Sequence, residues 1–429
     1  MALSLRILGA VGMLLCQIVL ARSLGVVGFG DYSQTVAWIQ FLCIFGKCGL
    51  DNSSLRFVSE YVTVGETSRL RGFVRDSTRV SLLASLLTSV AVIAYVATFK
   101  DSIGETLAQC LTVGSLMIPL ISLRQIHEAS LRGFGRITES QLSFIVWPFT
   151  LVLMTTFIWI VMPGYVSSTE AIQLHLVSVC LVSAMVYFFF RRSKSRMPLD
   201  ASPVTSRQIW AKTASAFFIA ELLIALKGRV CVAMAGVMLG SDSAGVYAAM
   251  ERFAEASLLG SQSLGLIIAP QFASMFAAGR YKDMRRLLWR GQLLGLAFTL
   301  PVAIAVACFG PVLFRLLGKG YEDGWAVLLM LLGSACITSL AGPSAYVLQM
   351  TGRERSMLLI TGACAISNVL LSLLLVRPFG IIGFGIAQMI TSLVWTVGIR
   401  LFLLVHPAWQ EGVSDRVLHP NQIDTEEPL

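Results

Sequence analysis

The sequence predicts an all-α, polytopic membrane protein with about twelve transmembrane helices. Hydrophobic residues make up 56% of the chain and charged residues only 13%. A soluble domain typically has about 45–50% apolar residues and about 25% charged residues. A hydrocarbon core of about 30 Å needs about 20 apolar residues in a helix, and the chain has many apolar runs of this length. Runs such as residues 81–99 lack the apolar–polar alternation of membrane β-strands, so helices are favoured over a barrel.

The predicted spans follow one another along nearly the whole chain. We expect the first apolar run to be retained as a helix, because no small-x-small cleavage site precedes the next span. The predicted spans are residues 3–24, 31–50, 79–99, 106–124, 140–162, 171–190, 213–239, 244–268, 291–314, 325–350, 358–376 and 381–405.

The distribution of basic residues predicts the orientation of these spans. With twelve spans and both termini in the cytoplasm, the cytoplasmic connections hold 21 Lys and Arg and the opposite connections hold five. This asymmetry is the positive-inside pattern. The net charge of +9 therefore indicates topology and contact with anionic lipid, and no nucleic-acid partner is predicted.

An internal repeat predicts two six-helix lobes. A shift of 215 residues aligns Gly25, Gly30 and Tyr32 with their counterparts Gly240, Gly245 and Tyr247. Because each half holds an even number of spans, the lobes should be related by a pseudo-two-fold axis along the membrane normal. The predicted parts are an N-terminal lobe (1–190), a cytoplasmic linker (191–207), a C-terminal lobe (208–406) and a disordered cytoplasmic tail (407–429).

No metal site or cofactor-binding motif is predicted. The nine cysteines all lie in apolar runs without a Cys-x-x-Cys pair, and the four histidines are scattered. The glycine motifs at residues 25–30 and 380–385 read G-x-x-G-x-G, which does not match the dinucleotide fingerprint. We interpret these glycines as turns at the start of membrane helices, where two backbones can approach closely.

Charged residues inside spans are the candidate functional residues, because burial in lipid costs about 2.5 kcal/mol or more unless a cavity or a partner compensates it. Glu251 and Glu255 are four residues apart and share a helix face, and Arg252 can pair with Glu255. Structural pairing remains an alternative to substrate contact for every one of these groups. We predict substrate binding by Lys47, Lys227, Arg229 and Arg252, and ion coupling or charge pairing by Glu221, Glu251 and Glu255.

Short motifs near the N-terminus resemble the opening of polysaccharide transporters. They are LARSLGVVGFGDYS at residues 20–33, GLD at 49–51 and RFVSEY at 56–61. These transporters belong to the multidrug, oligosaccharidyl-lipid and polysaccharide flippase superfamily. The resemblance implies two six-helix lobes around a central cavity. It also implies that the protein moves an undecaprenyl-diphosphate-linked oligosaccharide to the outer leaflet by alternating access.

The resemblance also implies a biological setting. It places the protein in the cell inner membrane as a non-enzymatic flippase for surface polysaccharide biosynthesis, with a glycan polymerase and glycosyltransferases as possible partners. Two alternatives stay open. One is a cation-coupled multidrug extruder of the same superfamily. The other is a membrane glycosyltransferase or polymerase, although the chain has neither a large soluble loop nor a concentrated set of acids.

Overall fold

The computed structural model describes residues 2–161, 166–194, 204–227, 230–350 and 354–405. Within these ranges the regular structure is helical and includes no strand, which confirms the all-α class. The helices are α1 (Ala2–Lys47), α2 (Leu50–Val64), α3 (Thr67–Ile103), α4 (Glu105–Ser115), α5 (Met117–Gly133), α6 (Ile137–Val161), α7 (Ser168–Lys194), α8 (Arg207–Lys227), α9 (Val230–Leu239), α10 (Ser241–Ser257), α11 (Leu259–Ala277), α12 (Tyr281–Cys308), α13 (Gly310–Leu317), a 3₁₀ turn η1 (Glu322–Gly324), α14 (Trp325–Met350), α15 (Glu354–Phe379) and α16 (Ile381–Val405).

About twelve membrane crossings are consistent with these helices. Ten segments of the described chain are long and apolar enough to cross a bilayer. Helix α1 has 46 residues, or about 69 Å at about 1.5 Å per residue, which is enough for two crossings of a core of about 30 Å. Its helical geometry breaks at Gly25, between the first two predicted spans. Helices α10 and α11 meet at Leu258 and together cover the predicted eighth span.

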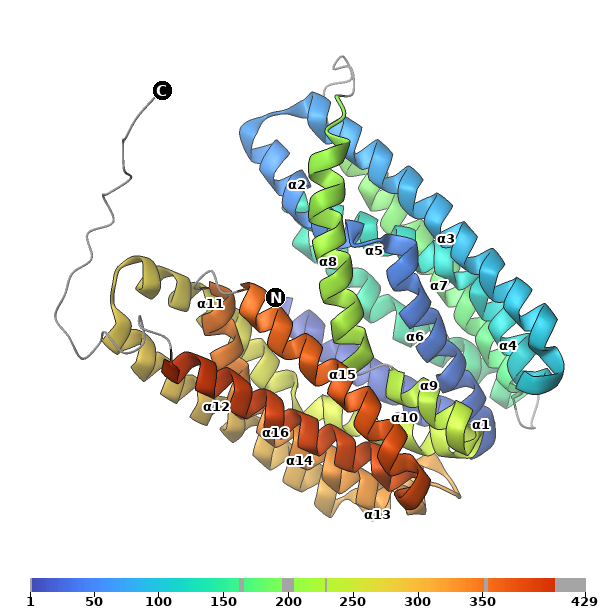
Figure 1. Ribbon diagram of the computed structural model, residues 1–429. Helices are drawn as coiled ribbons and strands as arrows, with labels where there is room; N and C mark the ends of the chain where they lie inside the picture. The colour runs from blue at the N-terminus through green and yellow to red at the C-terminus, as the bar shows by residue number, and fades with distance from the viewer. Residues whose placement is uncertain (1, 162–165, 195–203, 228–229, 351–353, 406–429) are drawn as a thin grey trace, which may run out of the picture.

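The helices form two groups that diverge from a common end. Figure 1 shows α2–α7 on one side and α11–α16 on the other, with α8 between them and with α1, α9 and α10 where the groups converge. The predicted domain boundaries stay predictions. Residues 195–203 of the predicted linker and the whole predicted tail lie outside the described residues.

The convergent end is a close contact between α1 and α10. A β-carbon on Gly30 would overlap the carbonyl oxygen of Ser241, and one on Gly245 would overlap that of Val26. The side chains of Asp31 and Ser241 are hydrogen-bonded beside this contact. Because a β-carbon fits on neither glycine, the predicted close backbone approach is confirmed at Gly30.

Helix α8 packs against both groups of helices. Near its start, Trp210 is buried, lies edge-on to Phe73 of α3 at 5.3 Å between ring centroids, and donates a hydrogen bond of 2.9 Å from Nε1 to Tyr61 Oη of α2. Farther along α8, Leu223 would contact a β-carbon on Gly362 of α15. This helix therefore connects α2 and α3 physically with the group that contains α15.

Candidate substrate cavity

A cavity of about 640 Å³ lies between the two groups of helices. Its walls come from α1, α5, α6 and α7 on one side and from α9, α10 and α11 on the other. Six charged side chains line it: Arg124, Glu128, Arg132, Glu251, Arg252 and Glu255.

One charged wall is a stripe along α5. Arg124, Gln125, Glu128 and Arg132 occupy positions i, i+1, i+4 and i+8, so the helical repeat places them on one face. Arg124 Nη1 donates to Glu128 Oε1 at 3.0 Å, and both side chains are mostly buried. Among the residues that the structure describes, Arg132 forms no ion pair, and its buried Nε donates no hydrogen bond. Arg132 is therefore a cation of the cavity wall that is available to an anion.

The facing charged wall is a stripe along α10. Glu251, Arg252 and Glu255 all line the cavity, as their helical spacing predicts. Arg252 Nη1 donates to Glu255 Oε2 at 2.7 Å, so the expected pairing of these two residues is confirmed. The roles assigned to them in substrate binding and ion coupling stay predictions.

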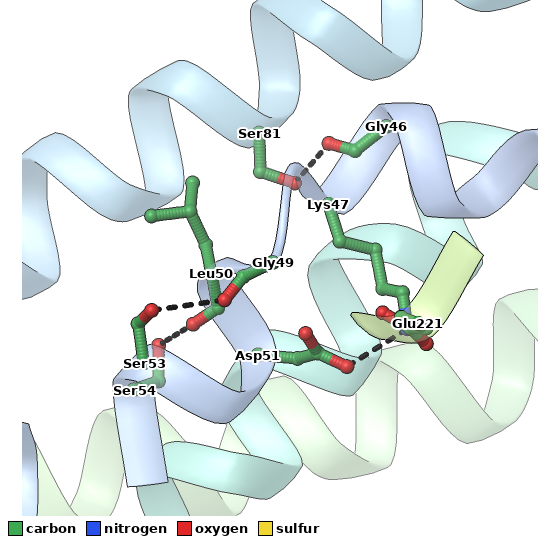
Figure 2. A network of polar contacts seen from close by, with 9 residues as sticks. All are labelled: Gly46, Lys47, Gly49, Leu50, Asp51, Ser53, Ser54, Ser81 and Glu221. Carbon is green, nitrogen blue, oxygen red and sulfur yellow. Dashed lines mark hydrogen bonds and ion pairs between the residues drawn. The ribbon is translucent and has the colours of Figure 1, made fainter. Parts of the chain in front are cut away.

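Lys47 and Glu221 do not line this cavity but form a separate ion cluster. Lys47 Nζ is 2.8 Å from Asp51 Oδ2 and also contacts Glu221 Oε1 in the α8 helix (Figure 2). The Lys47 side chain is only 5% exposed. A contact across 174 positions pairs these two candidates with each other outside the cavity lining. The assignment of Lys47 to substrate binding stays a prediction. Charge pairing by Glu221 is observed.

Two further candidates are placed only in part. Lys227 is the last residue of α8, and its side chain lies outside the described part of the chain. Arg229 lies outside the described residues altogether. Their assignment to substrate binding stays a prediction.

Aromatic side chains form part of the cavity lining. Tyr32 Oη and His175 Nδ1 are hydrogen-bonded at 2.9 Å, and the His175 ring is 5.2 Å from the Trp147 ring centroid. All three residues line the cavity. Among the described residues, no group of three His, Cys, Asp or Glu side chains could hold a metal ion. The cavity of the described chain thus offers polar and aromatic contacts for a bound molecule.

Sequence reasoning did not select Arg124 and Arg132 as site residues. The predicted span 106–124 puts Arg124 at the edge of a span and Arg132 in the connection that follows it. The structure continues α5 to Gly133 and lines the cavity with this polar extension. The i, i+4, i+8 spacing of Arg124, Glu128 and Arg132 was the signal that could have identified them.

Two families match the sequence. One, described as polysaccharide biosynthesis protein, matches residues 2–276. The other, described as MatE, matches residues 216–374. The chain is also 22% identical over 384 residues to the uncharacterized membrane protein EpsK of Bacillus subtilis (strain 168). The aligned region covers 87% of this chain and 75% of EpsK.

Solved transporters share the fold. An inward-facing multidrug resistance MATE family transporter of the MOP superfamily matches with a TM-score of 0.75 at 14% identity, covering 97% of this chain and 99% of the other. The lipid II flippase MurJ in an inward closed conformation matches with a TM-score of 0.68 at 15% identity. This match covers 95% of the present chain and 87% of MurJ. These likenesses extend over nearly the whole of this chain and show that it has the same fold as these two proteins.

Proposed function

Because the chain belongs to the family of polysaccharide biosynthesis proteins, we propose that it is a flippase for a lipid-linked oligosaccharide. The substrate is an undecaprenyl-diphosphate-linked glycan unit, which moves from the cytoplasmic to the outer leaflet for surface polysaccharide biosynthesis. The lipid II flippase MurJ, a protein of the same fold, supports this assignment by its named substrate.

The observation that carries the proposal is Arg132. Its guanidinium lies in the cavity wall and forms no ion pair with a described residue. Arginine binds phosphate oxygens through paired, charge-assisted hydrogen bonds. Arg124 and Arg252 line the same cavity but already pair with Glu128 and Glu255, so they can assist by exchanging partners.

The mechanism needs no covalent step. In the conformation of the structure, α1 and α10 are in close contact, and the two groups of helices diverge from that end (Figure 1). We take this contact as the closed side of the cavity. The head group of the substrate binds to the arginines in the wet cavity while the polyprenyl tail stays in lipid. Rocking of the two groups then closes the divergent end and separates α1 from α10, which exposes the head group on the other side.

The proposal includes a cellular setting. The protein lies in the inner membrane with both termini in the cytoplasm, so the divergent end, where the basic α2–α3 and α11–α12 connections lie (Figure 1), faces the cytoplasm. A glycan polymerase and the glycosyltransferases that build the unit are the expected functional partners.

A cation-coupled multidrug extruder is the second candidate. Glu128, Glu251 and Glu255 put three carboxylates in the cavity, and carboxylates can bind protons, sodium ions or cationic drugs. The likeness to a MATE multidrug transporter favours this alternative at the level of fold. The choice between the two candidates depends on whether an anion or a cation is carried.

Surface glycan export tests the proposal directly. In a strain that lacks the chromosomal gene, Arg132→Ala should reduce export at least tenfold, a loss of about 1.4 kcal/mol or more, because one hydrogen bond to a charged group contributes about 1.5–3 kcal/mol. Arg69→Ala is the matched control, because Arg69 is an exposed residue of α3 outside the cavity. Both variants must be present in the membrane at the wild-type level.

Drug susceptibility separates the two candidates. If the protein is a flippase, the deletion strain should lose surface glycan and should not become sensitive to cationic drugs. Normal export by the Arg132→Ala strain, or drug sensitivity of the deletion strain with intact surface glycan, contradicts the flippase proposal.

A further inference from the structure

The cavity wall is unusually rich in glutamine. The chain has 15 glutamines, and five of them line this one cavity. Only one of the five makes a side-chain hydrogen bond to a described residue, namely Gln17, whose Nε2 donates to the Ala248 carbonyl at 3.2 Å. The other four are Gln40, Gln125, Gln141 and Gln262. Each free amide can donate two hydrogen bonds and accept others without carrying charge.

Aromatic side chains lie among these amides on α6. Gln141, Phe144 and Trp147 follow one another at intervals of three residues, so they span an arc of about 120° of the helix and all line the cavity. The main-chain carbonyl oxygen of Trp147 accepts hydrogen bonds from Thr150 Oγ1 at 2.9 Å and from Ser178 Oγ at 3.2 Å, and the second bond ties this part of α6 to α7. Its indole N–H donates to none of the described residues and is free for a ligand.

The charges of the cavity leave little for a second anion. Arg124 and Arg252 are paired with glutamates of their own helices. Among the described cavity residues only Arg132 is a cation without a carboxylate partner, and the proposed function assigns it to the diphosphate. An acidic sugar would bring a further negative charge close to Glu128, Glu251 and Glu255 without a cation to compensate it.

We propose that Gln125 of α5 together with Gln141 and Trp147 of α6, which all line the cavity, forms a subsite for an uncharged sugar of the glycan. This inference rests on the proposed function, because it requires that the cavity take a lipid-linked glycan. The amides match the hydroxyl and acetamido groups of a neutral sugar, which both donate and accept hydrogen bonds. Trp147 supplies a flat apolar face together with one N–H donor. A hydrophobic cation would use neither the four free amides nor the indole N–H.

Binding of short-chain probes to the full-length purified protein tests the subsite. The probes are farnesyl diphosphate, farnesyl diphosphate esterified to N-acetylglucosamine, and farnesyl diphosphate esterified to glucuronic acid, each titrated by calorimetry. The N-acetylglucosamine probe should bind about tenfold tighter than farnesyl diphosphate, since about two net hydrogen bonds are gained. The glucuronic acid probe should bind no tighter than farnesyl diphosphate.

Variants of the wall should remove only the contribution of the sugar. Gln141→Leu and Trp147→Leu should each reduce the tenfold preference to threefold or less while the affinity for farnesyl diphosphate stays within twofold of wild type. Arg132→Ala should weaken both probes by the same factor. Trp147→Phe keeps a ring in place and guards against misfolding, and it should lose only part of the preference. The matched controls are Gln109→Leu on α4 and Trp289→Leu on α12, which lie outside the cavity.

The outcomes separate the two proposals. If wild type binds farnesyl diphosphate and the N-acetylglucosamine probe equally, or if both wall variants keep the tenfold preference, the subsite is overturned and the flippase proposal stands. If the glucuronic acid probe binds as tightly as the N-acetylglucosamine probe, the assignment to an uncharged sugar is overturned. If wild type binds none of the probes, the proposed function fails and the subsite fails with it.

Discussion

Gly30 of α1 and Gly245 of α10 face each other in direct backbone contact. A β-carbon on Gly245 would lie 3.0 Å from the Gly30 nitrogen and 3.2 Å from its α-carbon. These two glycines are also the residues that the 215-residue repeat aligns with each other. Repeat-related residues can touch only where the pseudo-two-fold axis passes between them. If the two predicted lobes are related by such an axis, it passes through this contact between α1 and α10.

Substitution of Gly30 by alanine should open this contact. The new methyl group would overlap the Ser241 carbonyl, so α1 and α10 must separate, at a cost of about 1–3 kcal/mol for an overpacked contact. We expect a lower unfolding temperature of the purified protein and reduced export. Gly342→Ala on α14 is the matched control, because no heavy atom lies within 4 Å of its β-carbon position, and it should behave as wild type. Equal unfolding temperatures for the two variants would contradict the contact.

A disulfide across the closed end should lock the transporter. A β-carbon on Gly320 would lie 3.5 Å from Val26 Cβ, which is within the range of about 3.5–4.5 Å that a disulfide needs. In a background without the native cysteines, oxidation of Val26→Cys/Gly320→Cys should stop export, and reduction should restore it. Gly320→Cys alone is the control, since the positive φ of 94° at this residue is strained for any side chain. Export that continues after complete cross-linking would refute opening at this end.

The repeat made the local geometry of the closed end predictable. Gly25 and its repeat partner Gly240 adopt nearly the same backbone conformation, with φ 70° and ψ 176° in one and φ 99° and ψ 169° in the other. Both have positive φ, which explains why both positions hold glycine. The pairing of Arg252 with Glu255 was predictable for a similar reason, because a spacing of three residues fixes their proximity in any helix.

Contacts between distant segments were not predictable from spacing. Lys47 is a cation inside a predicted span, as expected of a residue that binds an anionic substrate. Its partner Glu221 is 174 positions away, and only the packing of α8 beside α2 brings the two side chains together. Arg132 was missed for the opposite reason. Its helix continues past the apolar run, so a residue that reads as part of a cytoplasmic connection lines the cavity.

Removal of the Trp210 side chain should detach the start of α8. Trp210 is 4% exposed and packs on Phe73, so Trp210→Ala should cost about 3 kcal/mol or more of stability. Tyr61→Phe removes only the acceptor of the indole N–H and should cost about 1–3 kcal/mol. Thermal unfolding of the purified variants measures both effects. Trp289→Ala, which removes a side chain that is 61% exposed, should change stability little, and a larger loss there than at Trp210 would contradict this packing.

Neutralisation of Lys47 should destabilise the protein through the two carboxylates that it leaves behind. Asp51 Oδ1 and Glu221 Oε2 are already buried without a hydrogen-bond partner, and their side chains are only 13% and 24% exposed. Breaking a buried ion pair from one side costs about 3–5 kcal/mol because the remaining charge is uncompensated. Lys47→Met should therefore lower the unfolding temperature strongly.

A compensated variant distinguishes charge from packing in this cluster. Lys47→Met combined with Asp51→Asn and Glu221→Gln removes all three charges and should recover most of the lost stability, because no uncompensated buried charge remains. Arg69→Met is the control, because it breaks only the exposed pair with Glu66 and should cost about 1 kcal/mol or less. A triple variant no more stable than Lys47→Met would show that the lysine acts through packing of its aliphatic chain, and the ion cluster would lose its structural role.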